Sequence, residues 1–347
     1  MLIQSSILIA SLTTFIAIII LRPFAISVNL TDSPSERKLH TGSVPLIGGL
    51  AMYFGVTVSI LFLPGGLYNF NFFLLSSLIL VSIGVLDDHR DISVAIRLIF
   101  QALVAIIIVS GADISIASFG YILGEGEILL GSWSYVVTLI AIVAAINAVN
   151  MADGIHGLAA GNSLVTFGSI LLLSIGSLTN VNLWIAILFC SVLPIFLIHN
   201  LCIGISKRKR IFMGDAGSMF IGLGVIWLLV DFSQGKDYIF SPVIALWIFA
   251  APIIDMVSSI FRRIASGKSP FKPDVFHTHH LLLHLGIKEK NVLSIVILFS
   301  ILMAIIGVLG ELYQVAEWLM FVGFIVIFII YILWCRWAML VIKNKAE

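Results

Sequence analysis

The chain has 347 residues, of which 60% are hydrophobic and only 11% are charged. Soluble domains average about 45–50% apolar and about 25% charged residues, so this composition excludes a soluble globular protein and predicts an integral membrane protein. The net charge is +1, and Cys190, Cys202 and Cys335 all lie in apolar runs, which argues against a disulfide framework.

The apolar runs predict the transmembrane segments. The first run contains no basic residue before Arg22, a pattern typical of a retained span rather than of a cleaved signal peptide. Because a helix needs about 20 apolar residues to cross the hydrocarbon core, the sequence predicts an all-α polytopic membrane protein with about eleven transmembrane helices. They are expected at 2–22, 45–63, 69–86, 95–112, 134–150, 158–177, 183–203, 213–230, 241–261, 293–312 and 316–341.

Positive charge predicts the orientation of these spans. Of the 19 Lys and Arg, all but Lys236 lie in or beside the loops that follow odd-numbered spans, and so do all eight histidines. The positive-inside rule therefore places these loops in the cytoplasm, the N-terminus outside and the C-terminus in the cytoplasm. We expect one membrane domain over 1–347, with its active site formed by the cytoplasmic loops 23–44, 87–94, 150–157, 204–214 and 262–292.

The first two of these loops carry candidate ligands. Lys38 precedes the glycine-rich segment GSVPLIGG and is a candidate for substrate binding. The third span ends in LDDHRD, where the adjacent carboxylates of Asp87 and Asp88 repel each other unless a cation lies nearby. Hard oxygen ligands of this kind suit Mg²⁺. The alternative is a solvated helix end whose charge Arg90 balances.

The segment AAINAVNMADGIHGLAAG follows the fifth predicted span. Asn147, Asn150, Asp153 and His156 recur at intervals of three residues. In a continuous helix each such step turns the face by about 60°, so His156 would point away from Asn147. We therefore expect a helix break at Asp153–Gly154 that lets the four side chains converge. For Asn147, hydrogen bonding between helices is a credible alternative.

Asp215 begins the eighth predicted span, in RKRIFMGDAGS, directly after a run of basic residues. Glycine permits close approach of a ligand, and a helix N-terminus favours anions, so Asp215 is a plausible metal ligand in a phosphate site. An ordinary helix cap at Asp215 is the alternative. Asp255 lies inside the ninth span, and we expect it to pair with Arg262 or Arg263 about two turns further on.

The longest predicted cytoplasmic loop contains a cluster of imidazoles, at His277, His279, His280 and His284. No cysteine accompanies them, so protonatable donors for a pyrophosphate fit better than a zinc site. A pH-sensitive surface loop is the alternative. Carboxylates for a metal, cations and imidazoles for phosphate, and amides for a polar head group on one membrane face together indicate phosphoryl transfer at the bilayer surface.

The order DD, NxxNxxDGxxGL, FMGDxGS and PDxxHxHH resembles the polyprenyl-phosphate N-acetylhexosamine-1-phosphate transferases along nearly the whole chain. The resemblance implies transfer of N-acetylglucosamine 1-phosphate from UDP-GlcNAc to undecaprenyl phosphate, with Mg²⁺ or Mn²⁺ and release of UMP. It assigns catalysis to Asp87, Asp88, Asp215 and His279, and the metal to Asp215 and Asp88. It assigns substrate binding to Lys38, Asn150, Asp153, His156, Asn200, Phe212, Arg262, His277 and His280.

The resemblance also implies the protein's setting, the bacterial inner membrane with the active site on its cytoplasmic face. The expected partners are a UDP-sugar, undecaprenyl phosphate and the lipid bilayer, with no nucleic acid; a homodimer is left open. The product would start O-antigen, enterobacterial common antigen or related cell-envelope polysaccharides. Three alternatives stay open: another UDP-N-acetylamino sugar as donor, a Mg²⁺-dependent membrane prenyltransferase, and a transporter. The family usually has DGxDGL where this chain has His156 in place of the second Asp.

Overall fold

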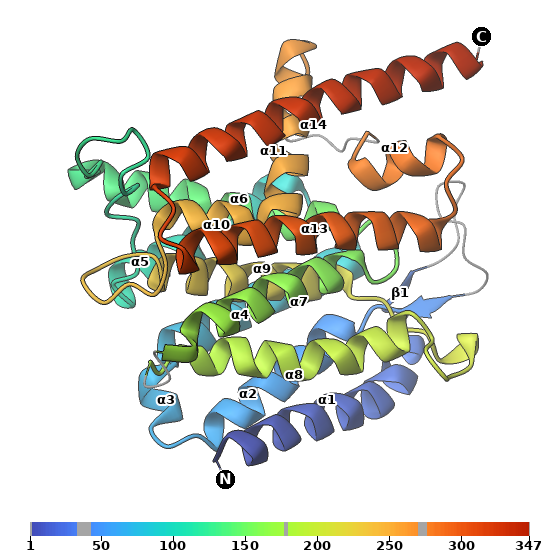
Figure 1. Ribbon diagram of the computed structural model, residues 1–347. Helices are drawn as coiled ribbons and strands as arrows, with labels where there is room; N and C mark the ends of the chain where they lie inside the picture. The colour runs from blue at the N-terminus through green and yellow to red at the C-terminus, as the bar shows by residue number, and fades with distance from the viewer. Residues whose placement is uncertain (1, 33–42, 177–179, 270–275, 347) are drawn as a thin grey trace. The chain divides into compact units, whose positions relative to one another are not determined.

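The computed structural model describes residues 2–32, 43–176, 180–269 and 276–346, and it is mostly helical (Figure 1). The helices are α1 (Leu2–Ser27), α2 (Gly48–Leu61), α3 (Gly66–Asn69), α4 (Asn71–Arg90), α5 (Val94–Gly111), α6 (Ser134–Ala152), α7 (Leu158–Leu173), α8 (Leu183–Asn200), α9 (Gly214–Asp231), α10 (Pro242–Ile248), α11 (Ala250–Ala265), α12 (Thr278–His284), α13 (Glu289–Leu312) and α14 (Glu317–Ala346). Two short strands, β1 (Thr31–Asp32) and β2 (Val44–Pro45), pair antiparallel, with Thr31 opposite Pro45.

Nine helices in the described part of the chain are long and apolar enough to cross a membrane, and the bent pair α10 and α11 would make a tenth. Large apolar side chains on the outer helices stay exposed: Ile20 is 63% exposed and Leu340 is 61% exposed. Exposing so much apolar surface to water would cost free energy, whereas contact with lipid chains does not. The prediction of a polytopic helical membrane protein is therefore confirmed.

The predicted count of eleven spans is not confirmed. The segment expected at 45–63 forms α2, which has 14 residues and is shorter than the other candidate spans. The segment expected at 241–261 is divided into α10 and α11, whose axes differ by 88° (Figure 1). The break lies at Phe249, whose φ of −115° and ψ of 20° depart from helical geometry. Hydropathy alone does not detect a bend of this kind, because both halves are apolar.

By internal contacts the chain divides into two compact units. The first unit comprises Met1–Ile114, Thr138–Asn150 and Ser177–Leu228, and the second comprises Ser115–Val137, Met151–Gly176 and Leu229–Glu347. The units are interleaved along the sequence, so each is built from segments distant in the chain. The expectation of one functional domain over the whole chain stays a prediction.

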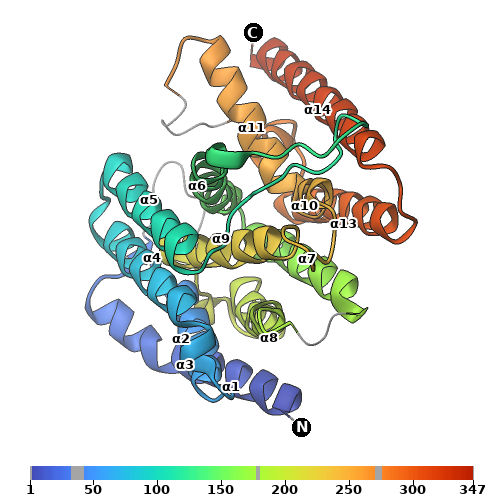
Figure 2. The same cartoon turned by 90° about the vertical axis from the view of Figure 1, so that its left-hand side faces the viewer.

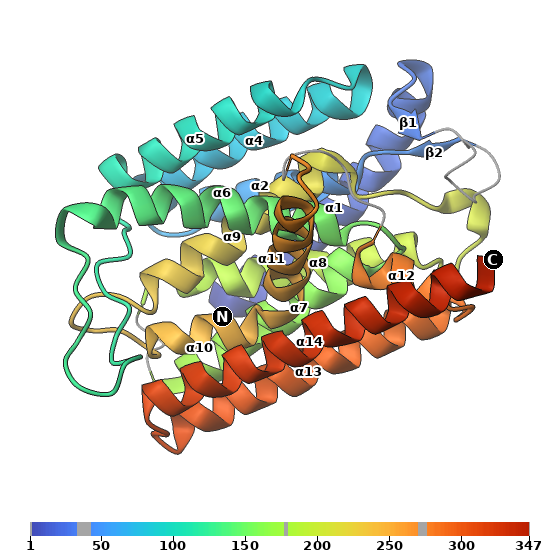
Figure 3. The same ribbon diagram turned by 90° about the horizontal axis from the view of Figure 1, so that it is seen from above.

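In the first unit, α1 packs against α2 and α8, and α4 lies alongside α5 (Figure 2; Figure 3). Its core includes Phe73, whose ring meets Trp227 edge-on at 5.4 Å, and Phe189, whose ring centre is 4.9 Å from that of Phe220. Gly84 of α4 lies directly against the backbone of Ala216 in α9, at a distance that leaves no room for a Cβ atom. This close approach brings the end of α4 to the start of α9.

In the second unit, α13 packs against α7, α10, α11 and α12, while α14 packs against α10, α11 and α12. Two buried hydrogen bonds connect these helices. The hydroxyl of Ser300 donates to Asn162 Oδ1 at 2.7 Å, and the hydroxyl of Thr166 donates to the carbonyl of Ile248 at 2.9 Å. Polar side chains between apolar helices are stabilising when they are paired in this way.

Candidate active site

Two aspartates of the first unit share one arginine. Nη1 of Arg97 donates to Asp87 Oδ2 at 2.7 Å and to Asp215 Oδ2 at 3.3 Å. The side chain of Asp87 is 3% exposed, whereas those of Asp215 and Arg97 are 31% and 26% exposed. Because a single guanidinium nitrogen contacts both carboxylates, α4, α5 and α9 contribute to one charged cluster that is partly open to a ligand. We call these three residues the carboxylate cluster.

The turn between α4 and α5 positions two members of this cluster. Asp87 lies in the last turn of α4, and its Oδ1 accepts from the backbone N–H of Ile92 at 2.9 Å. Ser93 then caps α5, because its hydroxyl accepts from the N–H of Ile96 at 3.4 Å. Arg97 follows in the first turn of α5, where the short connection holds it beside Asp87.

Asp88 has a different environment from Asp87. Its Oδ1 accepts from the N–H of Asp215 at 2.8 Å, and its Oδ2 accepts from the N–H of Ala216 at 3.4 Å. Asp88 therefore caps the N-terminus of α9 and satisfies N–H groups that have no partner within the helix. Gly214 has a φ of 73° and packs against the Asp88 carboxylate, so a Cβ atom there would clash with it. The interpretation of Asp215 as the helix cap is wrong, since Asp88 supplies this cap.

Asn150 completes the surroundings of Asp215. Its Nδ2 donates to Asp215 Oδ1 at 2.7 Å and to the hydroxyl of Ser218 at 2.9 Å. Asn147, one turn earlier, donates instead to Gln101 Oε1 at 2.7 Å. The helix-to-helix alternative for Asn147 is therefore confirmed, whereas Asn150 belongs with the carboxylate cluster.

Arg97 was not predicted from the sequence as a site residue. The alternative for LDDHRD had Arg90 balance the charge, but Arg97 makes the ion pairs with Asp87 and Asp215. The available signal was a cation at the start of an otherwise apolar span, VAIRLIFQAL. Positive-inside anchoring explained that cation equally well, so nothing in the sequence distinguished it as a site residue.

Phe212 and Asn200 lie beside the loop that precedes α9. The N–H of Phe212 donates to the carbonyl of Pro45 at 2.9 Å, which fixes this loop to β2, and the Phe212 side chain is half-buried. Asn200 is 4% exposed, and its Nδ2 donates to the carbonyl of Ile211 at 3.0 Å. Asn200 thus supports the loop backbone, while the substrate contacts expected for both residues stay predictions. Lys38 lies outside the described residues.

In the second unit, α6 ends at Ala152 and α7 begins at Leu158. The predicted break at Asp153–Gly154 is therefore confirmed, and Gly157, with a φ of 80°, completes the turn. Asp153 is exposed, and the backbone N–H of His156 donates to Glu289 Oε1 at 3.4 Å. The substrate contacts expected for Asp153 and His156 stay predictions.

The histidine segment, residues 277–284, packs against this turn. The ring of His279 lies directly against Gly154, where a Cβ atom would clash with Nε2. His279 is 2% exposed, and burial lowers its pKa to about 3, so the imidazole is neutral near pH 7. A neutral, buried ring does not suit the protonated phosphate donor that the sequence suggested, and the catalytic role of His279 stays a prediction. His280, whose ring centre is 4.2 Å from that of His279, is half-buried.

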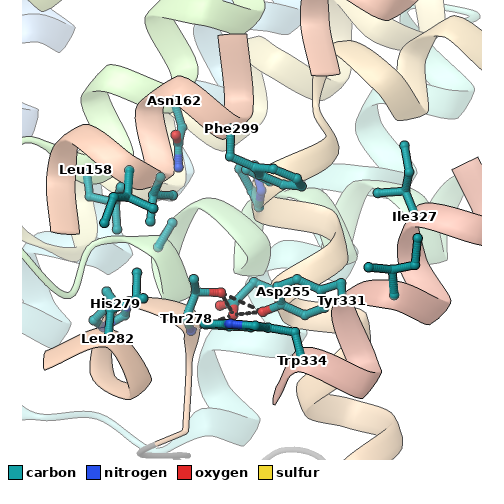
Figure 4. A pocket seen from close by; sticks show the side chains of 16 residues that line it. Leu158, Asn162, Asp255, Thr278, His279, Leu282, Phe299, Ile327, Tyr331 and Trp334 are labelled. Carbon is teal, nitrogen blue, oxygen red and sulfur yellow. Dashed lines mark hydrogen bonds between the residues drawn. The ribbon is translucent and has the colours of Figure 1, made fainter. Parts of the chain in front are cut away.

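Asp255 of α11 is bound by groups other than the arginines expected from the sequence. His277 Nδ1 donates to Asp255 Oδ2 at 2.7 Å. The hydroxyls of Thr278 and Tyr331 donate to Oδ1 at 2.7 and 2.6 Å (Figure 4). The predicted pairing with Arg262 or Arg263 is not among these contacts. Arg262 lies over the ring of Phe276, 5.9 Å from its centre.

The chain is similar in sequence to a known family of proteins. The model of glycosyl transferase family 4 matches residues 70–233. The chain is 41% identical to an undecaprenyl-phosphate alpha-N-acetylglucosaminyl 1-phosphate transferase of Yersinia pestis, over 82% of this chain and 78% of that protein. It is also 41% identical to the Haemophilus influenzae protein of the same name, over 87% of this chain and 85% of that protein.

The chain belongs to glycosyl transferase family 4.

The family model covers all the residues of the carboxylate cluster, together with Asn150 and the NMADG turn. The histidine segment lies beyond that model. Membership of this family excludes the prenyltransferase and transporter alternatives. The resemblance to phosphoglycosyl transferases that was drawn from the motifs is confirmed.

The metal expected in this family can be compared with the donors present. No group of three or more His, Cys, Asp or Glu in the described ranges is arranged to hold a metal ion by itself. Mg²⁺, however, is usually held by one or two carboxylates together with substrate phosphates. Asp87 and Asp215 supply two carboxylates, and the guanidinium of Arg97 between them indicates that the pair accommodates positive charge. The donor set therefore fits Mg²⁺ bound jointly with a diphosphate.

Proposed function

We propose that the protein transfers N-acetylglucosamine 1-phosphate from UDP-GlcNAc to undecaprenyl phosphate, giving undecaprenyl-diphospho-GlcNAc and UMP. The observation that carries this proposal is the carboxylate cluster, in which Asp87 and Asp215 share Arg97. The names of the relatives, which are about as long as this chain and 40–41% identical to it, support the choice of lipid and sugar.

Asp215 and Asp87 would hold Mg²⁺, or Mn²⁺ in its place. Asp88 was the second ligand expected from the sequence, but both of its oxygens accept from backbone N–H groups. Asp87 uses only Oδ1 in this way, and its Oδ2 contacts the Arg97 nitrogen that also contacts Asp215, so Asp87 is better suited. When bound, the metal neutralises charge on the diphosphate of the nucleotide sugar. Asn150 keeps Asp215 in place by donating to its Oδ1. Oδ2 of Asp215 then faces Arg97 and would be the oxygen that contacts the ligand.

The reaction needs little help from a base. The second pKa of a phosphate monoester is about 6, so the lipid phosphate is mostly a dianion at neutral pH. One of its oxygens attacks the phosphorus that carries the sugar, and the bond from this phosphorus to the oxygen of UMP breaks. Arg97 stabilises charge on the phosphates, and catalysis arises mainly from positioning and charge neutralisation.

A two-step route through an aspartyl phosphate is the rival mechanism. It would place the sugar phosphate on Asp87 or Asp215 before the lipid arrives. Direct attack is favoured because both carboxylates are ion-paired with Arg97, an environment that weakens a carboxylate as a nucleophile. Incubation with radiolabelled UDP-sugar alone distinguishes the routes, since only the two-step route yields a labelled protein.

The proposed location is the bacterial inner membrane, with the carboxylate cluster on the cytoplasmic face. This side follows from the distribution of Lys and Arg among the loops. The product would enter O-antigen, enterobacterial common antigen or related cell-envelope polysaccharide synthesis. The roles proposed for Asp153, His156 and the histidine segment are contacts with the nucleotide sugar and its phosphates.

A UDP-sugar panel tests the activity. Membranes that contain the protein are incubated with undecaprenyl phosphate, Mg²⁺ and one UDP-sugar at a time, and released UMP is measured. UDP-GlcNAc should give the highest rate, and membranes with Asp215→Asn should give none. A higher rate with another UDP-N-acetylamino sugar would change the donor but keep the reaction, whereas no UMP with any donor would refute the proposal.

A further inference from the structure

Asp255 is a membrane-helix carboxylate to which the proposed function assigns no role. It lies in the first half of α11, where its neighbours along the helix are apolar or small, and its side chain is only 14% exposed. Ionisable residues inside membrane helices are costly to bury and are usually functional. The hydrogen-bond partners of Asp255 therefore indicate what this carboxylate does.

These partners come from two other helices of the second unit. Oδ1 accepts from the backbone N–H of Thr278 at 2.8 Å, from the Thr278 hydroxyl at 2.7 Å and from the Tyr331 hydroxyl at 2.6 Å. Oδ2 accepts from Nδ1 of His277 at 2.7 Å. One carboxylate thus caps the start of α12 and joins α12 to α14, as Figure 4 shows for the hydroxyls of Thr278 and Tyr331.

The bond from His277 has a chemical consequence. A carboxylate can only accept hydrogen bonds, so Nδ1 of His277 must carry a proton. Nε2 is then the one ring nitrogen left for a substrate, as an acceptor when the ring is neutral and as a donor when the ring is charged. A buried carboxylate that orients a histidine in this way fixes both its tautomer and its ring plane. With its side chain 6% exposed, His277 has little freedom to adopt another orientation.

We propose that Asp255 is a positioning residue for the transfer reaction, which acts by holding His277 through Nδ1 so that Nε2 is available to the nucleotide sugar. The proposal rests on the proposed function, which places the histidine segment at the substrate. It differs from a purely structural role, in which Asp255 would only join α11, α12 and α14.

Kinetics of matched variants separate these two roles. In the full-length protein in detergent we expect Asp255→Asn to lower kcat by about 10- to 100-fold. This is the range of about 10- to 100-fold found when the hydrogen-bond partner of a metal-bound histidine is removed. Because Asp255 acts through His277, the double variant Asp255→Asn with His277→Gln should be no slower than His277→Gln alone. Tyr331→Phe removes one hydrogen bond to the same carboxylate but keeps the His277 pair, so it should retain kcat within about threefold.

The opposite results would overturn the proposal. They are a kcat of Asp255→Asn equal to that of the original protein, effects of the two substitutions that multiply, or a Tyr331→Phe variant as slow as Asp255→Asn. Nitrogen NMR of isotopically labelled histidine gives a readout that does not need activity: the His277 signal, assigned with His277→Gln, should report a protonated Nδ1 and should change in Asp255→Asn. An absence of UMP release by the unaltered protein would refute the proposed function, while this spectrum would still test the His277–Asp255 bond.

Discussion

At the scale of single residues, the two adjacent aspartates of LDDHRD have separate tasks. Asp87 pairs with Arg97 in the carboxylate cluster, whereas Asp88 holds the backbone of Asp215 and Ala216. Asp88 therefore also determines where the Asp215 side chain is placed. Its charge and its capping function can be separated by substitution.

Asp88→Asn should keep the thermal stability of the protein but lose most of its activity. The amide oxygen still accepts from an N–H at the start of α9, and Asn and Asp are about equally good helix caps. The negative charge that would attract the metal ion held by Asp87 and Asp215 is lost, so the metal and the diphosphate should bind less tightly. Asp88→Ala should lose both, with a destabilisation of about 0.5–2 kcal/mol. Melting temperature and UMP release are measured on the same preparations; full activity of Asp88→Asn would limit Asp88 to capping.

His156→Asp should keep or raise activity, because it restores the carboxylate that this family usually has in the turn after α6. Asp153→Asn in the same turn should abolish activity and serves as the control for the assay. Initial rates of UMP release at saturating UDP-GlcNAc provide the measurement. A loss of activity in His156→Asp would instead assign the imidazole an independent role.

Residue chemistry predicted the members of the site better than their partners. Asp87, Asp215 and Asn150 could be identified from the sequence, because polar side chains in apolar helices are rare, costly to bury and usually functional. It could not identify Arg97 or the cap made by Asp88, since both depend on which helix ends meet in space. The wrong expectation for Asp255 has the same origin: arginines two turns away along α11 were visible in the sequence, while His277 and Tyr331 come from distant segments.

At the scale of elements, the start of α9 depends on one glycine. Gly214 adopts a φ of 73° and leaves no room for a Cβ atom beside the Asp88 carboxylate. The sequence predicted a glycine needed for close approach at this position, although it expected a ligand rather than Asp88. The break after α6 was likewise predicted from glycine, whereas the bend between α10 and α11 was not, because Phe249 carries no such signal.

Gly214→Ala should therefore lower both stability and activity, and Gly204→Ala is its matched control. Gly204 also has a positive φ, 69°, but a Cβ atom there meets nothing within 4 Å. The control should show only the backbone strain of about 1–2 kcal/mol, with activity retained. Gly214→Ala adds the collision with Asp88 and displaces the N–H groups that it caps. Equal melting temperatures and equal rates for the two variants would contradict this account of α9.

At the scale of the whole molecule, the distribution of Lys and Arg predicts which loops face the cytoplasm. The helices confirm a polytopic membrane protein, and the charge pattern predicts that Lys236 lies outside and Lys209 inside. In a background without the native cysteines, Lys236→Cys should react with a membrane-impermeant maleimide in intact spheroplasts. Lys209→Cys should react only after the membrane is permeabilised. The reverse pattern would place the carboxylate cluster on the opposite face and contradict the proposed location.

The central claim concerns which bond of the nucleotide sugar is broken. The purified protein is given undecaprenyl phosphate, Mg²⁺ and UDP-GlcNAc that is radiolabelled in its β-phosphate, and the lipid and nucleotide products are separated. Transfer of the sugar phosphate predicts that the label appears in the lipid and that UMP is released in equal amount. Release of labelled UDP with an unlabelled glycolipid, or no labelled lipid at all, would contradict the account.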